Sequence, residues 1–332
     1  MPSGADRART WELEGQRLSI HVNADNFVRA ETDRMFADLQ RDAGGVNAFS
    51  HNRTPAAIEN QTVIRLNRDT LYSFAVVDLA EGATLTLPEH GARYLSAMVV
   101  NNDHYIYAIY HDAGTYQLTV AEHGTPYAMV GVRILADPND PADLAEVAVL
   151  QDQLGLTAAS TTPFEYPDYD PTSLDATRDA LLALVAQLTD LARTFGRPDE
   201  VDPIRHLMGA AAGWGGLPGS EATYLAAAPE QPGNHELTLA DVPVDGFWSV
   251  SVYNAKGYFE PNVHNRYSVN DITATPNADG SVTVRFGDYP DGTPNAIPTP
   301  EGWNILVRLY RPRPEILDGT WQLPGLVPTH VP

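Results

Sequence analysis

The fold of this chain is decided by residues 62–110, TVIRLNRDTLYSFAVVDLAEGATLTLPEHGARYLSAMVVNNDHYIYAIY. Short runs of β-branched and aromatic residues alternate there with turn residues such as Glu81-Gly82 and Pro88 to Gly91. YQLTVAE and YAMVGVRIL continue the pattern to residue 135. Several short strands at a spacing of roughly 8 to 12 residues are typical of antiparallel sheets. We therefore expect an antiparallel sandwich or barrel between residues 62 and 137.

Helical patterns lie on both sides of this region. Apolar residues recur at helical spacing from Asp25 to Gly44, where two glycines predict the end of the helix. Asp140 followed by Pro141 is a typical helix start, because the carboxylate caps free N–H groups and proline suits the first turn. A further helix is predicted from Leu174 to Phe195, before Gly196, and a shorter one at about 203–212.

Strand patterns resume in the last third, with HELTLA, FWSVSVYN, SVTVRFG and WNILVRLYRP. The Gly-, Pro- and Ala-rich stretch at 213–234 marks the passage between the two β regions. The sequence thus predicts an α+β protein, mainly β with helical insertions: two antiparallel β-sandwich or jelly-roll-like domains joined by a helical segment. The expected boundaries are 1–19 for an N-terminal segment, 20–138 for the first β domain, 139–232 for the helical segment and 233–332 for the second.

Composition excludes several classes of protein. The 43 acidic and 21 basic side chains give a net charge of -22, which repels nucleic acid and anionic membranes. The absence of cysteine excludes disulfides, thiolate metal sites and a cysteine nucleophile. No apolar run approaches the length of a membrane span, and no secretory signal is visible at the start. We therefore expect a cytoplasmic protein.

Motifs for the common catalytic folds are also missing. The sequence contains no GxSxG, HExxH, GxxxxGK[ST] or complete GxGxxG, so we predict no nucleotide, flavin or haem cofactor. The ten histidines show none of the spacings that bring two imidazoles to one ion. A divalent metal is left as the less favoured alternative, with His51, His104 and Asp69 as the residues that would have to converge.

Several longer strings carry a family resemblance. FVRAETDRMF, VIRLNRDTLYS, RYLSAMVVNNDHY, GTPYAMVGVR and DPADLAEVAVLQDQL resemble the family known as domain of unknown function 1254. GFWSVSVYNAKGYFEPN, NRYSVND, ADGSVTV and EGWNILVRLYRPRPEILDGTWQLP resemble its usual companion, domain of unknown function 1214. The resemblance runs from about residue 20 to 328 and implies two β-rich domains with helices between them, without an agreed reaction.

Two polar clusters at strand entries are the candidates for catalysis. The first is Asn67 to Ser73, where alternation puts Asp69 and Tyr72 on opposite faces of the strand. The second is Asn101 to Tyr105, in which His104 has carboxylate and amide neighbours able to orient its ring. We predict His104, Asp69 and Tyr72 as catalytic residues. The alternative is structural: turn formation in the first cluster and a hydrogen-bonded histidine in the second. His111, beside Asp112, is expected to be exposed.

The predicted substrate-binding residues combine polar groups near these clusters with an aromatic and amide-rich stretch of the second domain, which suits a pocket for an organic molecule or, alternatively, packing between domains. Arg133 and Arg308 interrupt apolar strands, so each is expected to form a buried ion pair with Asp69 or Asp103. The predicted substrate-binding set is Asn67, Arg68, Asp103, Tyr105, Arg133, Trp248, Tyr253, Asn254, Arg266 and Tyr267.

These residues support two functions of different classes. The first is an enzyme that acts on a small organic substrate by acid–base chemistry, as a hydrolase, lyase or isomerase, in the cleft between the domains. The second is a non-catalytic ligand-binding or assembly module, since β-sandwiches serve both purposes. A small molecule is the expected partner in either case. Sheet edges also favour a homo-oligomer.

Overall fold

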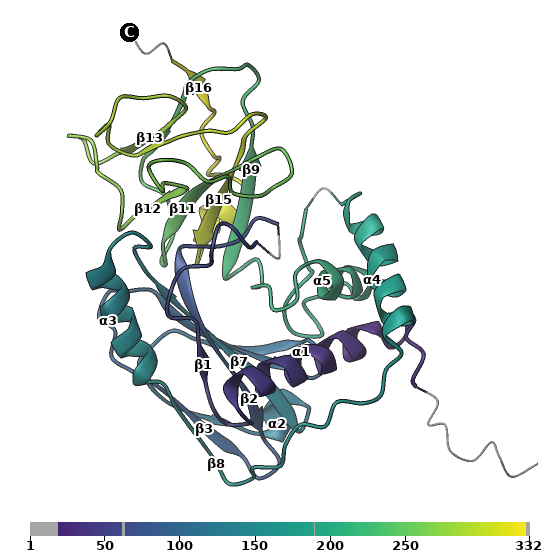
Figure 1. The fold of residues 1–332 in the computed structure, drawn as a ribbon. Helices are drawn as coiled ribbons and strands as arrows, with labels where there is room; N and C mark the ends of the chain where they lie inside the picture. The colour runs from purple at the N-terminus through teal and green to yellow at the C-terminus, as the bar shows by residue number, and fades with distance from the viewer. Residues whose placement is uncertain (1–18, 62–63, 189, 330–332) are drawn as a thin grey trace, which may run out of the picture.

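The computed structural model describes residues 19–61, 64–188 and 190–329. It contains two β-sandwiches, one from each half of the chain, with helices packed beside the first (Figure 1). The architecture is mainly β with helical insertions, as the sequence predicts. No closed barrel is formed by the four sheets of the described chain, and the jelly-roll topology stays a prediction.

The first sandwich pairs a five-stranded sheet with a three-stranded sheet. The strand orders are β1-β2-β7-β4-β5 and β6-β3-β8, and all the pairs are antiparallel. Of the seven strands expected at 62–137, TVIRL forms none in its described part, since residues 64–66 are turn and irregular chain. The strands are β1 (Ser50–His51), β2 (Thr70–Asp78), β3 (Ala83–Leu87), β4 (Leu95–Asn101), β5 (Ile106–Tyr110), β6 (Gly114–Leu118), β7 (Tyr127–Leu135) and β8 (Gly155–Ala158).

The second sandwich is built from two four-stranded sheets, ordered β14-β13-β10-β16 and β12-β11-β15-β9. Only β13 and β14 pair in parallel among the described strands. The strand β9 comes from the Gly-rich stretch expected to link the domains, yet it pairs with β15 along six residues. The strands are β9 (Ala222–Ala227), β10 (His235–Leu239), β11 (Trp248–Tyr253), β12 (Ser268–Asn270), β13 (Val282–Phe286), β14 (Ala296–Ile297), β15 (Asn304–Tyr310) and β16 (Val327–Pro328).

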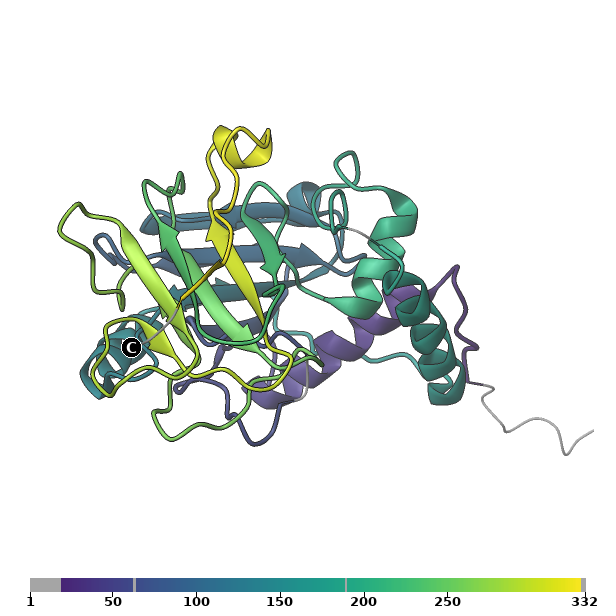
Figure 2. The same cartoon turned by 90° about the horizontal axis from the view of Figure 1, so that it is seen from above.

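Each sandwich has its own apolar core. The β1-β2-β7-β4-β5 sheet and the β12-β11-β15-β9 sheet each have one face in their own core and the other face toward the other sandwich. Leu71, Val99 and Val132 point into the first core, and Val250, Ile305 and Val307 point into the second. Because side chains alternate along a strand, the neighbouring residues on β2, β4, β7, β11 and β15 face the junction between the sandwiches. Figure 2 shows the strands of the second half crossing over those of the first.

The helices pack beside both sandwiches. They are α1 (Phe27–Ala43), α2 (Val120–His123), α3 (Pro141–Asp152), α4 (Pro171–Val185), α5 (Pro203–Ala212) and α6 (Pro314–Leu317). The predicted ends of α1 and α3 are confirmed: Gly44 ends α1 with φ 78°, and the Asp140 carboxylate accepts from the Ala142 N–H. The helix predicted to reach Phe195 is wrong in its second half, because α4 ends at Val185 and Leu184 is 57% exposed.

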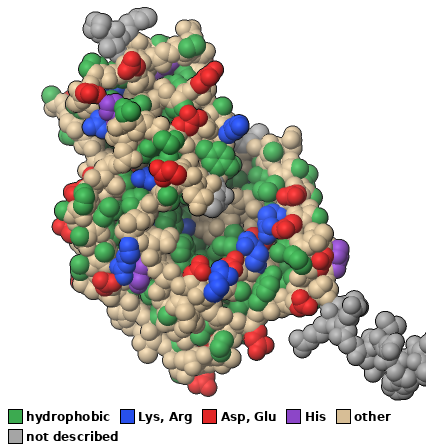
Figure 3. Space-filling view, viewed as in Figure 1, with side chains coloured by type: hydrophobic (Ala, Val, Ile, Leu, Met, Phe, Trp, Pro, Cys, Tyr) green, Lys and Arg blue, Asp and Glu red, His purple; other side chains and the backbone are tan. Residues whose placement is uncertain are grey.

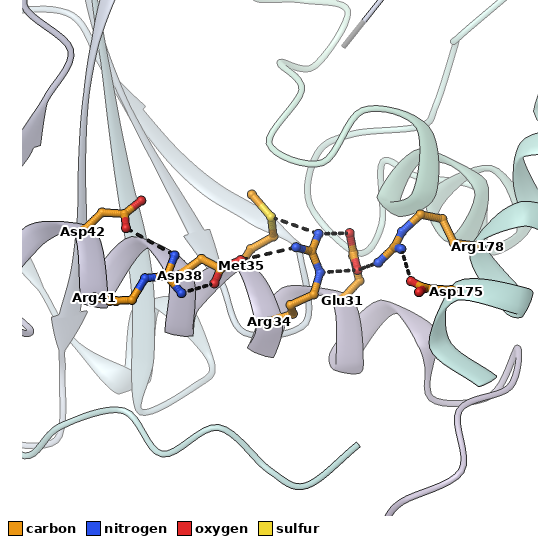
Figure 4. Close-up of polar contacts among 8 residues, drawn as sticks. All are labelled: Glu31, Arg34, Met35, Asp38, Arg41, Asp42, Asp175 and Arg178. Carbon is orange, nitrogen blue, oxygen red and sulfur yellow. Dashed lines mark hydrogen bonds and ion pairs between the residues drawn. The ribbon is translucent and has the colours of Figure 1, made fainter. Parts of the chain in front are cut away.

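Helix α1 crosses the five-stranded sheet and is tied to α4 by charge. Phe36 packs on the sheet with Val76 and Met98. On the other side of α1, the Glu31 carboxylate accepts from Arg34 of the same helix and from Arg178 of α4 (Figure 4). None of the helices within the described residues is long and apolar enough to cross a membrane.

Candidate functional site

A row of three polar side chains crosses the centre of the five-stranded sheet. Tyr72 of β2 lies directly opposite Arg133 of β7, and Arg133 lies directly opposite Ser96 of β4. Residues that pair in this way project on the same face of a sheet. The row therefore faces the junction between the two sandwiches, since Leu71 and Val132, one residue along, point into the first core.

Arg133 is a buried cation without a buried anion. It is 8% exposed, and Nη2 donates to the Gly215 carbonyl oxygen at 2.8 Å. Nη1 has no hydrogen-bond partner in the described chain, and no acidic side chain of those residues pairs with Arg133. The predicted ion pair of Arg133 with Asp69 or Asp103 is thus wrong. An unpaired buried charge is costly, so this guanidinium is suited to receive an anion.

Tyr72 is the aromatic neighbour of that cation. The Arg133 guanidinium carbon lies 5.3 Å from the centroid of the Tyr72 ring, and the Tyr72 hydroxyl accepts from Asn67 Nδ2 at 3.1 Å. Burial of this hydroxyl by itself raises its pKa, but the Arg133 charge and the bonds from Thr70 and Asn67 outweigh burial, and the pKa lies below its ordinary value of 10.0. Tyr72 is therefore better able to give up its proton than a free phenol.

Asn67 connects this row to the second sandwich. Its amide also donates to the Tyr310 hydroxyl of β15 at 3.0 Å. The Tyr310 ring stacks on Phe247 at 4.1 Å, and Tyr94 packs edge-on against Phe247 at 5.0 Å. Burial raises the pKa of the Tyr310 and Tyr94 hydroxyls, so both keep their protons. One phenol with a lowered pKa thus lies beside others with raised pKa values.

Asp69 and Arg308 form the buried ion pair that the sequence predicts. Asp69 Oδ2 lies 3.9 Å from Arg308 Nη1, and both side chains are at most 3% exposed. Asn270 Nδ2 reaches Asp69 Oδ1 at 3.3 Å, while Arg308 donates to the Tyr253 hydroxyl at 2.7 Å. Asp69 is therefore engaged with the second sandwich and neutralises the charge of Arg308.

His104 belongs to a different group, a stack of rings at the end of β4. Its ring lies 5.3 Å from His206 of α5 and 5.4 Å from Trp214, and its Nε2 accepts from the Gly215 N–H at 3.0 Å. Complete burial, reinforced by the neighbouring His206, lowers the pKa of His104 to about 3. The imidazole is thus neutral near pH 7, and its role as a catalytic acid or base stays a prediction that this environment does not favour.

Arg68, Tyr253 and Tyr267 meet where the chain enters β2. The Arg68 guanidinium lies 5.5 Å from the centroid of the Tyr267 ring and donates to the Ala56 carbonyl oxygen. The Tyr253 hydroxyl donates to the Leu66 carbonyl oxygen at 2.8 Å. These side chains hold Ala56 and residues 66–68 against the second sandwich.

The other predicted binding residues lie elsewhere. Asp103 pairs with Arg29 of α1 at the surface, and the Tyr105 ring stacks on His206 at 4.5 Å. Trp248 points into the second core, away from the junction. The Asn254 amide donates to the Glu260 carboxylate at 2.9 Å, and Arg266 borders a separate cavity in the second sandwich.

His111 is not exposed as expected, because its Nδ1 bonds to the Leu95 carbonyl oxygen and its Nε2 lies 2.8 Å from a Glu221 carboxylate oxygen. His51 contacts Ser73 on the opposite face of β2 from Tyr72. Neither His51 with His104 and Asp69, nor any other set of three or more His, Asp or Glu in the described chain, is arranged to hold a metal ion.

The surface is hollowed between α1, α5 and the loop that leads into β2 (Figure 3). The five-stranded sheet lies behind this hollow, and its β2 and β7 strands carry the row (Figure 1). A separate cavity of about 1000 Å³ opens among the loops of the second sandwich, lined by Tyr289 and Trp303 among others. Tyr72, Ser96 and Arg133 do not line this cavity. The size of a cavity therefore does not by itself identify the candidate site.

Sequence reasoning missed Ser96, Tyr94, Tyr224 and Tyr310 as members of the site. Alternation along the strands could have identified them. Where a strand is otherwise apolar, a polar residue at every second position indicates a face that does not enter the apolar core. Ser249 and Ser251 on β11, with Arg308 and Tyr310 on β15, follow this rule.

The fold and the junction define a protein of two antiparallel β-sandwiches joined through a polar and aromatic sheet face. The family model described as "Protein of unknown function (DUF1254)" matches residues 46–114, and the one described as "Protein of unknown function (DUF1214)" matches residues 226–314. The two matches follow each other in the order that the sequence motifs indicate, so the predicted resemblance to this pair of domains is confirmed. No curated protein matches the sequence.

A solved structure shares the fold. The VPA0106 protein from Vibrio parahaemolyticus is 18% identical over 93% of this chain and 98% of its own, with a TM-score of 0.69. An uncharacterised protein from Burkholderia cenocepacia is 16% identical over 87% of this chain and 84% of its own, with a TM-score of 0.49, too low to define a common fold.

Proposed function

We propose that this protein is an enzyme that acts on a small organic carboxylate by acid–base chemistry, at the junction between its two β domains. Arg133 orients the carboxylate and Tyr72 transfers the proton. Hydrolysis, elimination and isomerisation all need such a step. The observation that carries the proposal is the buried, unpaired Arg133 guanidinium directly opposite Tyr72.

The two residues complement each other chemically. A carboxylate accepts two parallel N–H bonds from a guanidinium, which fixes its orientation as well as its position. Tyr72, held by Asn67 and beside Arg133, has a lowered pKa and can serve as base when ionised and as acid when protonated. Asp69 and His104 remain alternatives for the acid–base role, with less support, because Asp69 is paired with Arg308 and His104 is fully buried.

A non-catalytic binding module is the second candidate. It is favoured by the tight aromatic packing of Tyr94, Phe247 and Tyr310, which fills part of the junction. Under this alternative Arg133 still binds a carboxylate, but Tyr72 supplies only a ring and a hydrogen bond. Self-association through sheet edges stays a prediction under both candidates, and a divalent metal stays the less favoured alternative.

The test is proton exchange on small carboxylic acids in D₂O, followed by NMR, with wild-type protein and the variants Tyr72→Phe and Arg133→Met. Wild type should exchange or convert at least one acid of the panel. Tyr72→Phe should bind that acid with little change and lose about 100-fold or more in rate, whereas Arg133→Met should lose binding.

Tyr105→Phe and Arg41→Met are the matched controls, because Tyr105 stacks on His206 and Arg41 is a surface residue of α1. Both should behave as wild type. Full activity in Tyr72→Phe would remove Tyr72 from the mechanism. If wild type binds an acid of the panel but neither exchanges its protons nor converts it, the non-catalytic module is favoured.

A further inference from the structure

Two rows of similar composition face each other across the junction, and they differ in charge. The first is Tyr72, Arg133 and Ser96; the second is Tyr224, Arg308 and Ser249 on β9, β15 and β11 of the other sandwich. Arg308 is neutralised by Asp69, whereas Arg133 has no acidic partner in the described chain. The site therefore offers one positive charge to a ligand.

The surroundings of Arg133 disfavour a second negative group. Its electrostatic neighbours are the four phenols of Tyr72, Tyr94, Tyr224 and Tyr310, and the next charged groups along the junction are Arg308 and Asp69, both close enough to act on Tyr310. Asp69 Oδ2 has no hydrogen-bond partner among the described residues and would repel a second anionic group. The phenols accept hydrogen bonds but supply no cation.

The next row on the same sheet face is apolar. Phe74 of β2, Gly131 of β7 and Met98 of β4 lie opposite one another, two residues along each strand from the polar row, which places them about 7 Å from it. Gly131 and Met98 are buried, and an added Cβ at Gly131 would lie only 3.1 Å from Met129 Sδ and 3.5 Å from the Phe74 ring, so Phe74 is the member of this row that a ligand can reach. Phe74 is only partly buried, and its ring stacks with Tyr72 at 5.6 Å.

The opposite direction along the strands is closed to a ligand. There Tyr94 packs against Phe247 and Tyr310 of the second sandwich, and all three side chains are at most 6% exposed. A ligand held by Arg133 therefore extends toward the partly buried Phe74 instead.

We infer that the natural substrate is a monocarboxylic acid with a compact apolar body, its carboxylate on Arg133 and its body over Phe74. This inference rests on the proposed function and narrows it to one substrate class. It excludes dicarboxylates, whose second charge would meet either Asp69 or the apolar row. It also excludes the shortest acids, which leave the apolar row uncovered.

The experiment measures affinity by calorimetry for four probes: phenylacetate, acetate, 1,4-phenylenediacetate and phenylacetamide. Wild type should bind phenylacetate about 30-fold more tightly than acetate, because the ring is buried on Phe74. The dianion and the neutral amide should bind about 100-fold more weakly than phenylacetate. Arg133→Met should abolish the preference for the acid over the amide.

Phe74→Ala tests the position of the body. It should weaken phenylacetate by about tenfold and leave acetate unchanged, since it removes the ring surface on which the body lies. Phe49→Ala is the matched control, because Phe49 is also partly buried but packs against the first core.

The outcomes distinguish a wrong substrate class from a wrong proposed function. If 1,4-phenylenediacetate or acetate binds as tightly as phenylacetate, the inferred substrate class is wrong, but the carboxylate site at Arg133 stands. If none of the three acids binds to wild type, or binding survives Arg133→Met, the proposed function falls together with the inference.

Discussion

Acidification should destabilise this protein through His104. The folded chain holds this imidazole neutral with a pKa of about 3, because it is buried between His206, Trp214 and Phe195, whereas the ordinary value is 6.5. Below pH 6.5 the unfolded chain takes up a proton at this position and the folded chain does not. The free energy of unfolding therefore falls as pH drops from 6.5 toward 3.

The expected size follows from one proton. A complete difference of one bound proton changes the free energy of unfolding by about 1.4 kcal/mol per pH unit. Between pH 7 and pH 5, His104 should therefore cost the wild type about 2 kcal/mol. His206, whose pKa burial also lowers, acts in the same direction.

The assay is urea unfolding at pH 7 and pH 5 for wild type, His104→Asn and Tyr105→Phe. Asparagine tolerates the positive φ of 64° at this position, so His104→Asn removes the titrating ring without adding backbone strain. This variant should lose about 2 kcal/mol less than wild type over the interval. Tyr105→Phe keeps the imidazole and should match wild type. An equal loss in His104→Asn and wild type would refute the assignment of a buried neutral imidazole.

Three further changes test the packing by thermal or urea unfolding. Glu31→Gln should lower the free energy of unfolding by about 1 to 2 kcal/mol, because Glu31 is buried but its partners Arg34 and Arg178 are partly exposed. Asp42→Asn, at the surface, is the control and should change this free energy by less than about 0.5 kcal/mol. Equal effects of the two changes would argue against the link between α1 and α4. Asp69→Asn should cost about 3 kcal/mol by leaving Arg308 without its carboxylate, and a neutral result would mean that the pair adds nothing. Gly246→Ala should lower the melting temperature, since an added Cβ would lie 2.7 Å from the Tyr310 carbonyl oxygen; an unchanged melting temperature would contradict that close approach.

The strands of both sandwiches could be predicted from the sequence because their signal is local. Alternation, β-branched residues and intervening turns identify β2 to β7 and four strands of the second half without any knowledge of their partners. Pairings and strands with weak local signals could not be found in this way. The strand β9 lies in an Ala- and Gly-rich stretch, and it forms only because β15 offers an edge.

The candidate site was only partly predictable for the same reason. Tyr72, Asn67 and Arg133 stand out as polar residues in or beside buried strands, and the ion pair of Arg308 with Asp69 follows from the cost of burying a charge. His104 was predicted to be catalytic because of its carboxylate and amide neighbours, and that role stays a prediction. Its burial by α5 and the 213–216 loop comes from segments about 100 residues away and cannot be read from its neighbours in the chain.

The sequence by itself determined the fold class, the resemblance to the two matched domains and the residues that interrupt buried strands, because each depends on local pattern or on motif order. Only the tertiary structure decided which of those residues share a site. Strand register brought Tyr72, Arg133 and Ser96 into one row, and the packing of the two sandwiches paired Asp69 with Arg308 rather than with Arg133. Register and domain packing depend on contacts between distant segments, so a local pattern carries no information about them.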